Sequence, residues 1–300
     1  IPYLIEIENK TSKLVREQYE NYPYPRWYNT YIPNRPVTIE ELAKNNGLQI
    51  INESVFKVAE PSILIAGCGT GQHAVYTASR FKRSQLLAID LSLASLSYAF
   101  RKTKEFSINN INFMQADILD LEKLDKQFDI IESSGVLHHM KEPVKGWKTL
   151  VNCLKSGGLM RIGLYSTLAR KHITKIRSEI EQTYPSDEKG AIRFFRENIL
   201  QSDEPSHVKL RSALDFYSLS ELKDLIFNVQ EHTFTIPELE KIINELGLSF
   251  CGFESQKIKR DFLNENKNAS DQYNLKKWSE FEISNPDTFF AMYQFWCQKM

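Results

Sequence analysis

The chain lacks three features that would commit it to a special environment: paired cysteines, a long apolar run and an excess of one charge. Its four cysteines lie far apart, at Cys68, Cys153, Cys251 and Cys297, and form no CxxC pair. This spacing argues against a zinc ribbon or a dithiol redox centre. No apolar stretch approaches the roughly 20 residues that cross a bilayer. We therefore expect a cytoplasmic protein with no metal site and no membrane partner.

Acidic and basic side chains balance, with 38 of each and a formal net charge of zero. Such a chain lacks the electrostatic excess that drives sequence-independent binding to nucleic acid. With 300 residues and no internal repeat or low-complexity tract, it is long enough to bury a full core. This length predicts one large domain, or one domain with a subdomain. Because the sequence opens with Ile1 and not Met, we expect that it could be part of a longer protein.

From residue 62 onward, short apolar strands alternate with helical periodicity, which is typical of βαβ units and a parallel sheet. A helix capped by Thr235 and ending at Gly247 is predicted before the last strands. The final two strands are expected to form an antiparallel pair at the sheet edge. We predict strands at 63–66, 86–90, 111–115, 128–132, 159–165, 248–253 and 291–299.

Two further regions flank or interrupt this alternation. At the amino terminus, Thr11 and Ser12 are candidate caps for a short helix, a proline-rich segment follows, and a second helix is predicted over 39–46. After Tyr165 a stretch rich in Arg, Lys and Glu predicts amphipathic helices. The expected organisation is an α/β protein with a lid over 1–60, a core from 61–165 and 236–300, and a helical insertion over 166–235.

A glycine cluster ends the first predicted strand, at Gly67, Gly69 and Gly71. Backbone amides in such a turn can approach a ligand closely, although a tight strand-to-helix turn explains the cluster as well. Asp90 ends the second strand about 20 residues later, where a carboxylate can accept the hydroxyl hydrogens of a ribose. Alone, Asp90 would more often be a helix cap.

Two more landmarks follow the third and fourth strands. Asp117 comes directly after the third strand, where a carboxylate could meet an adenine amino group. The loop 133–140 follows the fourth strand and carries His138 and His139. Because the carboxyl ends of parallel strands meet at one edge of a sheet, these landmarks and the glycine cluster converge on one ligand crevice. A nicotinamide or flavin enzyme would use the same parts, but its fingerprint places a third glycine at position 72, which is Gln72.

The segments 63–71, 87–90, 113–117 and 128–139 resemble the four signature motifs of class I S-adenosylmethionine (SAM)-dependent methyltransferases. The resemblance implies a Rossmann-like sheet, mostly parallel with an antiparallel last strand, and SAM as the cofactor. It also implies that the glycines line the methionine and ribose portion, that Asp90 binds the ribose, and that Asp117 with Ile118 borders the adenine. The cofactor contacts that we expect come from Gly67, Cys68, Gly69, Thr70, Gly71, His73, Asp90, Leu91, Asp117, Ile118, Ser133, Ser134, Gly135, Tyr19 and Arg26.

A narrower resemblance covers 15–27, 163–166 and Ala169-Arg170. These segments are similar to bacterial methyltransferase domains that often follow tetratricopeptide repeats, and to rickettsial protein-lysine methyltransferases, although this chain has no repeat array. We expect the aromatic segment to cover the strand ends, where its rings could enclose the sulfonium or a cationic amine. An aromatic staple that docks the amino terminus is an equal alternative. The expected substrate contacts are Tyr22, Tyr24, Trp27 and Tyr165.

If the acceptor is an amine or a hydroxyl, a base must take its proton, and His138 or His139 is the available imidazole. Packing against the cofactor is the favoured role of these rings. Tyr165 could touch substrate or satisfy a local carbonyl. The predicted function is methyl transfer from SAM to a protein side chain or a small molecule, with the insertion selecting the acceptor.

Three alternatives stay open: a SAM-binding module without catalysis, a dinucleotide-dependent oxidoreductase, and, less favoured, an RNA methyltransferase. The last would use basic residues near the start of the insertion, but acidic residues soon cancel their charge. The oligomeric state is not readable from the sequence.

Overall fold

The computed structural model describes residues 1–29, 32–183 and 189–300, and within these ranges it describes the side chains outside 181–189. Its centre is a seven-stranded sheet in the order β3-β2-β1-β4-β5-β7-β6. The first five strands pair in parallel, and β7 runs antiparallel to both β5 and β6. The strands are β1 Ser62–Ala66, β2 Gln85–Asp90, β3 Ile111–Gln115, β4 Phe128–Ser134, β5 Leu154–Tyr165, β6 Leu248–Phe253 and β7 Met292–Lys299.

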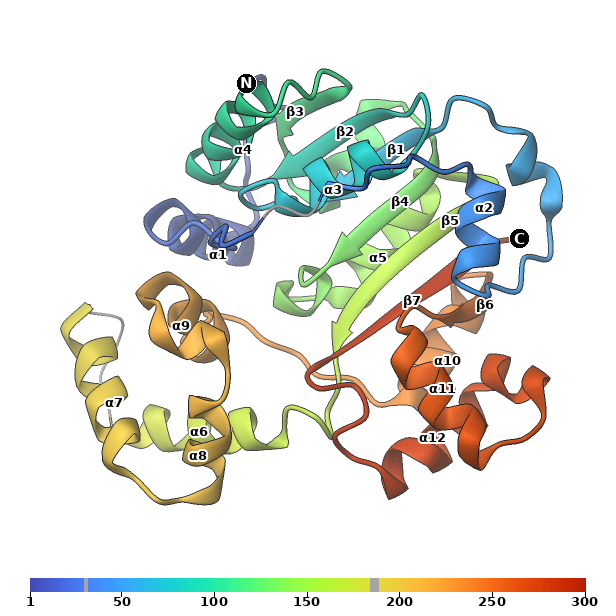
Figure 1. The fold of residues 1–300 in the computed structure, drawn as a ribbon. Coiled ribbons are helices and arrows are strands. Elements are labelled where there is room, and N and C mark those ends of the chain that lie inside the picture. The colour runs from blue at the N-terminus through green and yellow to red at the C-terminus, as the bar shows by residue number, and fades with distance from the viewer. Residues whose placement is uncertain (30–31, 184–188) are drawn as a thin grey trace.

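Helices cover both faces of this sheet (Figure 1). One apolar cluster packs α2, α3 and α4 against side chains such as Ile63, Ile65 and Trp296. The other packs α5, α10, α11 and α12 against the opposite face, including Leu64 and Met160. The helices are α2 Ile39–Asn45, α3 Gln72–Arg80, α4 Leu93–Glu105, α5 Pro143–Asn152, α10 Ile236–Glu245, α11 Gln256–Glu265 and α12 Leu275–Ser284.

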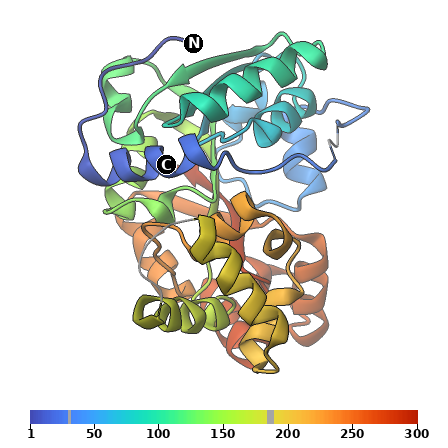
Figure 2. The same ribbon diagram turned by 90° about the vertical axis from the view of Figure 1, so that its left-hand side faces the viewer.

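The segment between β5 and α10 forms a separate helical unit, the insertion, which holds a core of its own. Its helices are α6 Lys171–Thr183, α7 Lys189–Gln201, α8 Pro205–Arg211 and α9 Leu219–Ile226, with a 3₁₀ turn η4 at Leu214–Tyr217. Buried Ile176, Phe216 and Leu222 lie at the centre of that core. The amino-terminal helix α1, Lys10–Asn21, crosses between the insertion and the sheet (Figure 2).

All seven predicted strands are present, because their apolar runs are buried on both sheet faces. The helix before β6 begins as predicted, since Thr235 and Glu238 form a reciprocal capping box. One local prediction is wrong. The cap of α1 is Asn9, whose side chain accepts from the Ser12 amide, and not Thr11 or Ser12. The final two strands form the antiparallel pair that was expected at the sheet edge, with β7 next to β5 and β6 outermost.

Within the described residues, no helix combines the length and the apolar content that crossing a membrane requires.

Candidate functional site

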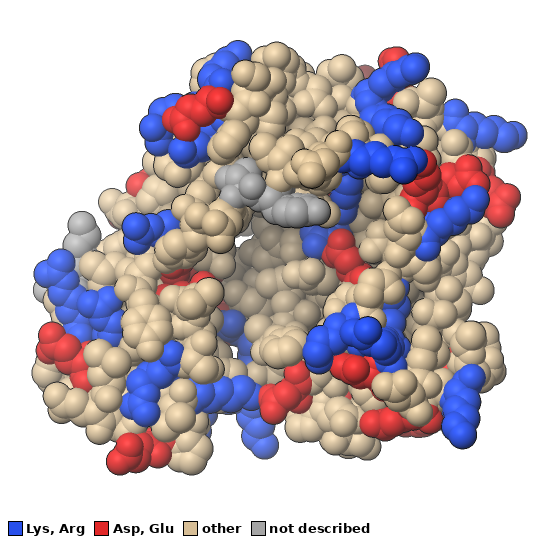
Figure 3. All heavy atoms as spheres, in the orientation of Figure 1, with Lys and Arg blue, Asp and Glu red and all other residues tan. Residues whose placement is uncertain are grey.

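A cavity of about 610 Å³ lies at the carboxyl ends of β1 to β4, roofed by α1 and bordered by α9. The space-filling view shows the molecule hollowed between the insertion and the sheet (Figure 3). The volume of the cavity falls within the range of roughly 300–1,000 Å³ that is typical of pockets for small ligands. The crevice predicted at the strand ends is therefore present as a cavity.

Most of the predicted site residues line this cavity, and the others lie outside its lining. The lining includes Gly67, Cys68, Gly69, His73, Asp90, Leu91, Asp117, Ile118, Ser134, Gly135, Tyr19, Tyr24, His139 and Tyr165. Outside the lining are Thr70, Gly71, Ser133, His138, Tyr22, Arg26 and Trp27.

The glycine loop has positive φ angles at Gly67, Gly69 and Gly71, of 76°, 51° and 89°. A Cβ on Gly69 would meet the Tyr24 carbonyl oxygen at 2.3 Å, and a Cβ on Gly71 would meet the Cβ of Ala99 at 2.5 Å. These glycines therefore admit close neighbours from the amino-terminal segment and from α4, besides leaving amides open to a ligand. The packing role was not part of the prediction.

Asp90 holds the glycine loop against the start of α4. Its Oδ2 accepts the Gly69 amide at 2.7 Å, and its Oδ1 accepts the Ser92 amide at 2.9 Å. Burial raises the pKa of this carboxyl, and the backbone donors oppose the rise. Asp90 lines the cavity, so its remaining lone pairs can accept hydroxyl hydrogens.

The proline-rich segment docks on the loop through Thr70. The Thr70 amide donates to the Tyr24 carbonyl at 3.0 Å, and its hydroxyl donates to the Pro25 carbonyl at 2.5 Å. Trp27 donates its indole N–H to the same hydroxyl at 3.0 Å and stacks on Phe106, the residue that follows α4. This placement favours the staple interpretation for Trp27. Arg26 is exposed above the Tyr28 ring.

Asp117 follows β3 and lines the cavity at that strand's end. Its Oδ1 caps the 3₁₀ turn η2, Ile118–Leu124, by accepting the Leu119 amide at 3.0 Å. Its Oδ2 is buried and has no hydrogen-bond partner in the part of the chain that the structure describes. A buried acceptor without a partner is unfavourable, so this oxygen is suited to a donor that a ligand brings.

The two histidines of the loop after β4 have different surroundings. His138 is fully buried behind the cavity, and its ring stacks on Tyr165 at 3.7 Å between centroids. His139 lines the cavity, its Nδ1 bonds the Gln230 carbonyl at 2.7 Å, and its Nε2 faces the Asn228 amide at 3.4 Å. Burial lowers the pKa of both, that of His139 to about 4. These contacts favour packing and positioning over proton transfer.

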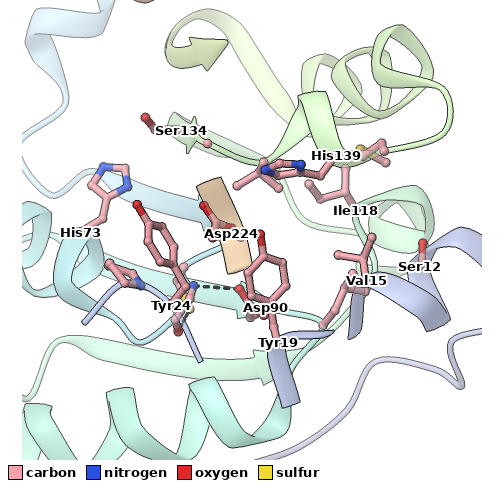
Figure 4. Close-up of a pocket in the computed structure, with 18 of the residues that line it drawn as sticks. Ser12, Val15, Tyr19, Tyr24, His73, Asp90, Ile118, Ser134, His139 and Asp224 are labelled. Carbon is pink, nitrogen blue, oxygen red and sulfur yellow. Dashed lines mark hydrogen bonds between the residues drawn. The ribbon is translucent and has the colours of Figure 1, made fainter. Parts of the chain in front are cut away.

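The insertion supplies a carboxylate that sequence reasoning missed. Asp224 of α9 lines the cavity and accepts the Tyr19 hydroxyl at 2.5 Å, while Asn228 bonds both groups. Tyr19, Tyr24 and Asp224 gather at the middle of the cavity, with Ser12 and Val15 towards one end and His73 towards the other (Figure 4). No motif marks Asp224, because only the tertiary structure brings it beside the strand ends.

A buried ionic network lies under the His73 end. Glu132 of β4 is fully buried and bonds His73 at 2.5 Å, Thr77 at 3.0 Å and Arg80. Burial alone would raise its pKa, but Arg80 and His73 hold the pKa of Glu132 well below the usual range. Arg161 joins the network through the His73 ring at 3.2 Å. His73 therefore has a structural partner besides the cofactor contact predicted for it.

Comparison with known families agrees with this geometry. Residues 63–158 match the family model described as a methyltransferase domain. The segment spans the glycine loop, Asp90, Asp117 and the histidine loop. Together with the sheet order, the match agrees with the class I fold that the resemblance predicted.

Individual relatives are more distant. A putative methyltransferase of Bacillus subtilis is 26% identical over 70% of this chain and 80% of its own length. An uncharacterized protein of Synechococcus is 28% identical over 67% of this chain and 50% of its own length. Among solved structures, PKMT2 of Rickettsia typhi, also solved with AdoHcy, superposes with a TM-score of 0.63 at 18% identity over 91% of this chain and 54% of its own. The likeness to PKMT2 is one of fold, and this chain spans about half the length of the Synechococcus and Rickettsia proteins.

Proposed function

We propose that this chain is a SAM-dependent methyltransferase whose cavity holds the cofactor across the strand ends. The adenine would lie between Ile118 and Asp117, the ribose on Asp90, and the methionine portion along Gly67 and Gly69. The observation that carries the proposal is the buried Asp117 Oδ2, an acceptor without a partner among the described residues, in the wall of a cavity of suitable size. The exocyclic amino group of adenine is a donor that fits it.

Bound SAM supplies a methyl group that its sulfonium has already activated. The chain then has to orient the acceptor and exclude water. α1 roofs the cavity, and Tyr19 and Tyr24 narrow it, so an acceptor entering beside Asp224 meets a sheltered site. The insertion, residues 166–235, would act as the cap that selects the acceptor.

Calorimetric titration with S-adenosylhomocysteine and with NAD tests the cofactor. We expect binding of S-adenosylhomocysteine and none of NAD, because Gln72 replaces the third glycine of the dinucleotide fingerprint. Asp117→Asn should weaken S-adenosylhomocysteine binding about tenfold, since the new amide nitrogen can place a donor against the adenine donor. Asp120→Asn, a matched change on the same turn but outside the cavity lining, should bind normally.

Turnover needs a separate measurement. Release of S-adenosylhomocysteine during incubation with SAM and fractionated lysate is expected for an enzyme. Cofactor binding with no release in any fraction would favour the regulatory module, and tight NAD binding alone would overturn the proposal.

A further inference from the structure

The insertion brings one carboxylate, that of Asp224 on α9, into the lining of the cavity. We propose that Asp224 binds the nitrogen of an amine acceptor, so that the enzyme methylates amines and not carboxylates or phosphates. This inference rests on the proposed function and names its substrate class. It assigns to Asp224 a role that no motif indicates.

Asp224 lies in the cavity wall, and one of its two carboxylate oxygens can still accept a hydrogen bond. Its side chain is 5% exposed and lines the cavity. Its two side-chain hydrogen bonds, from Tyr19 at 2.5 Å and from Asn228 at 3.3 Å, both go to Oδ1. Among the described residues, Oδ2 has no hydrogen-bond partner. An ammonium or amine N–H entering the cavity can therefore bond Oδ2 without displacing Tyr19.

Aromatic rings complete the surroundings of this carboxylate. Tyr19, Tyr24 and Tyr165 also line the cavity, and they reach it from α1, from the proline-rich segment and from the end of β5. Tyrosine faces attract cations through the ring quadrupole. The Tyr165 ring already stacks on His138 and meets the Arg170 guanidinium, so Tyr19 and Tyr24 are the rings open to a cation. A carboxylate beside these two tyrosines is complementary to an alkylammonium group, because it offers one charged acceptor and an apolar wall for the attached carbons.

The charge around the site also disfavours anionic acceptors. Asp224 influences the titration of Asp215, and Asp215 and Glu221 both influence that of Tyr24, so two further carboxylates lie near this part of the cavity wall. The nearby arginines are already paired: Arg170 with Glu231 at 2.7 Å, and Arg161 with Glu254 at 2.6 Å. A phosphate or carboxylate acceptor would meet like charge at Asp224.

The methyl transfer can be written with these groups so that protons and electrons are all accounted for. The acceptor ammonium releases one proton through Asp224 to water, and the free amine keeps its lone pair. That lone pair forms the new N–C bond while the electrons of the breaking C–S bond remain on sulfur. The products are S-adenosylhomocysteine and an N-methylammonium ion, which remains bonded to Asp224 until release. His139 is less suited to hold the amine, since both of its ring nitrogens face other groups.

Sinefungin is a direct probe, because it is a SAM analogue in which a carbon bearing an amino group replaces the methylated sulfur. The amine of bound sinefungin would occupy the position of the transferred methyl group, within reach of Asp224. We expect wild-type protein to bind sinefungin at least about tenfold more tightly than S-adenosylhomocysteine by calorimetry, as for a hydrogen bond between charged groups. Asp224→Asn should abolish this preference and leave S-adenosylhomocysteine affinity within about twofold.

The same titrations separate the possible failures. Equal affinities of wild-type protein for the two ligands would overturn the role of Asp224 without any variant. In an Asp224→Asn protein with an unchanged melting temperature, equal weakening of both ligands would also overturn it, because Asp224 would then bind the ammonium that both ligands share. Absence of S-adenosylhomocysteine binding to wild type would overturn the proposed function itself. Glu197→Gln, an exposed carboxylate change in α7 outside the cavity, should behave as wild type.

Discussion

His139 lines the cavity as a neutral ring, and this has a consequence for stability. Burial lowers its pKa to about 4, whereas a histidine in an unfolded chain titrates near 6.5. Between these two values the unfolded chain binds more protons, so the free energy of unfolding falls as pH falls from about 6.5 to about 4. Asp224 opposes this trend, because burial raises its pKa to about 6 and the folded state gains its proton first.

The contribution of His139 is therefore best isolated by a variant. His139→Asn keeps a side-chain donor for the Gln230 carbonyl and removes the titrating ring. Between pH 7 and pH 5 the loss of unfolding free energy should be smaller in this variant by about 2 kcal/mol. Urea denaturation at both pH values measures the difference. Identical pH dependence in the two proteins would contradict a buried, neutral His139.

Among the helices, α1 carries the contacts that close the cavity. The Glu20 carboxylate accepts the first two amides of α4, from Leu93 at 2.6 Å and from Ala94 at 3.0 Å. The Ser92 hydroxyl, in turn, donates to the Tyr19 carbonyl at 3.1 Å. A negative charge at a helix amino terminus satisfies amides that lack a partner inside the helix. The end of α1 is thus attached to the helix that follows Asp90.

Glu20→Ala should loosen this attachment by about 1 kcal/mol, the usual effect of losing an N-terminal cap. We expect faster amide hydrogen exchange in α1 and in the first turn of α4, together with weaker binding of S-adenosylhomocysteine. Glu17→Ala, on the exposed side of α1, is the matched control and should exchange as wild type. Unchanged exchange in the Glu20 variant would show that other contacts hold α1 in place.

Across the whole molecule, the buried Glu132 network joins the two halves of the sheet. Glu132 on β4 bonds three side chains of α3, and Arg161 on β5 links that cluster to Glu254 beyond β6. Removing one partner of a buried ion pair leaves the other without compensation. The network lies under the cavity, so it also sets the position of His73.

Glu132→Gln should lower the free energy of unfolding by about 3–5 kcal/mol, because Arg80 would remain buried with only the more distant Glu254 carboxylate, at 3.8 Å, as its partner. Thermal and urea denaturation measure this loss. Glu105→Gln breaks exposed pairs with Arg101 and Lys102 and should leave the unfolding midpoint unchanged. A similarly small effect at position 132 would mean that the network adds little to stability.

Much of the fold was predictable because its signals are local. An apolar run bounded by turn residues defines each strand, and a capping box at Thr235 defines the start of α10. The positions of Asp90 and Asp117 followed from the strands, since parallel strands bring their carboxyl ends to one edge. Two local details differed: the α1 cap moved to Asn9, and β5 begins earlier, at Leu154.

Other parts of the site depend on contacts between distant residues. Asp224 meets Tyr19 across 205 positions, and Glu132 meets His73 across 59. No spacing rule connects such pairs, because each follows from how the insertion and the helices pack on the sheet. The aromatic segment shows the same limit: Tyr24 points into the cavity, while Trp27, three residues on, stacks on the residue that follows α4.

The amino-acid sequence alone determined the parallel sheet, the glycine loop and the carboxylates that follow β2 and β3, because periodicity and turn chemistry act between neighbours along the chain. Only the tertiary structure decided which side chains share the cavity, which histidine faces it and which carboxylate of the insertion lines it. Those choices arise from the packing of α1 and α9 over the strand ends, where burial and charge, and not local pattern, govern what each group can do.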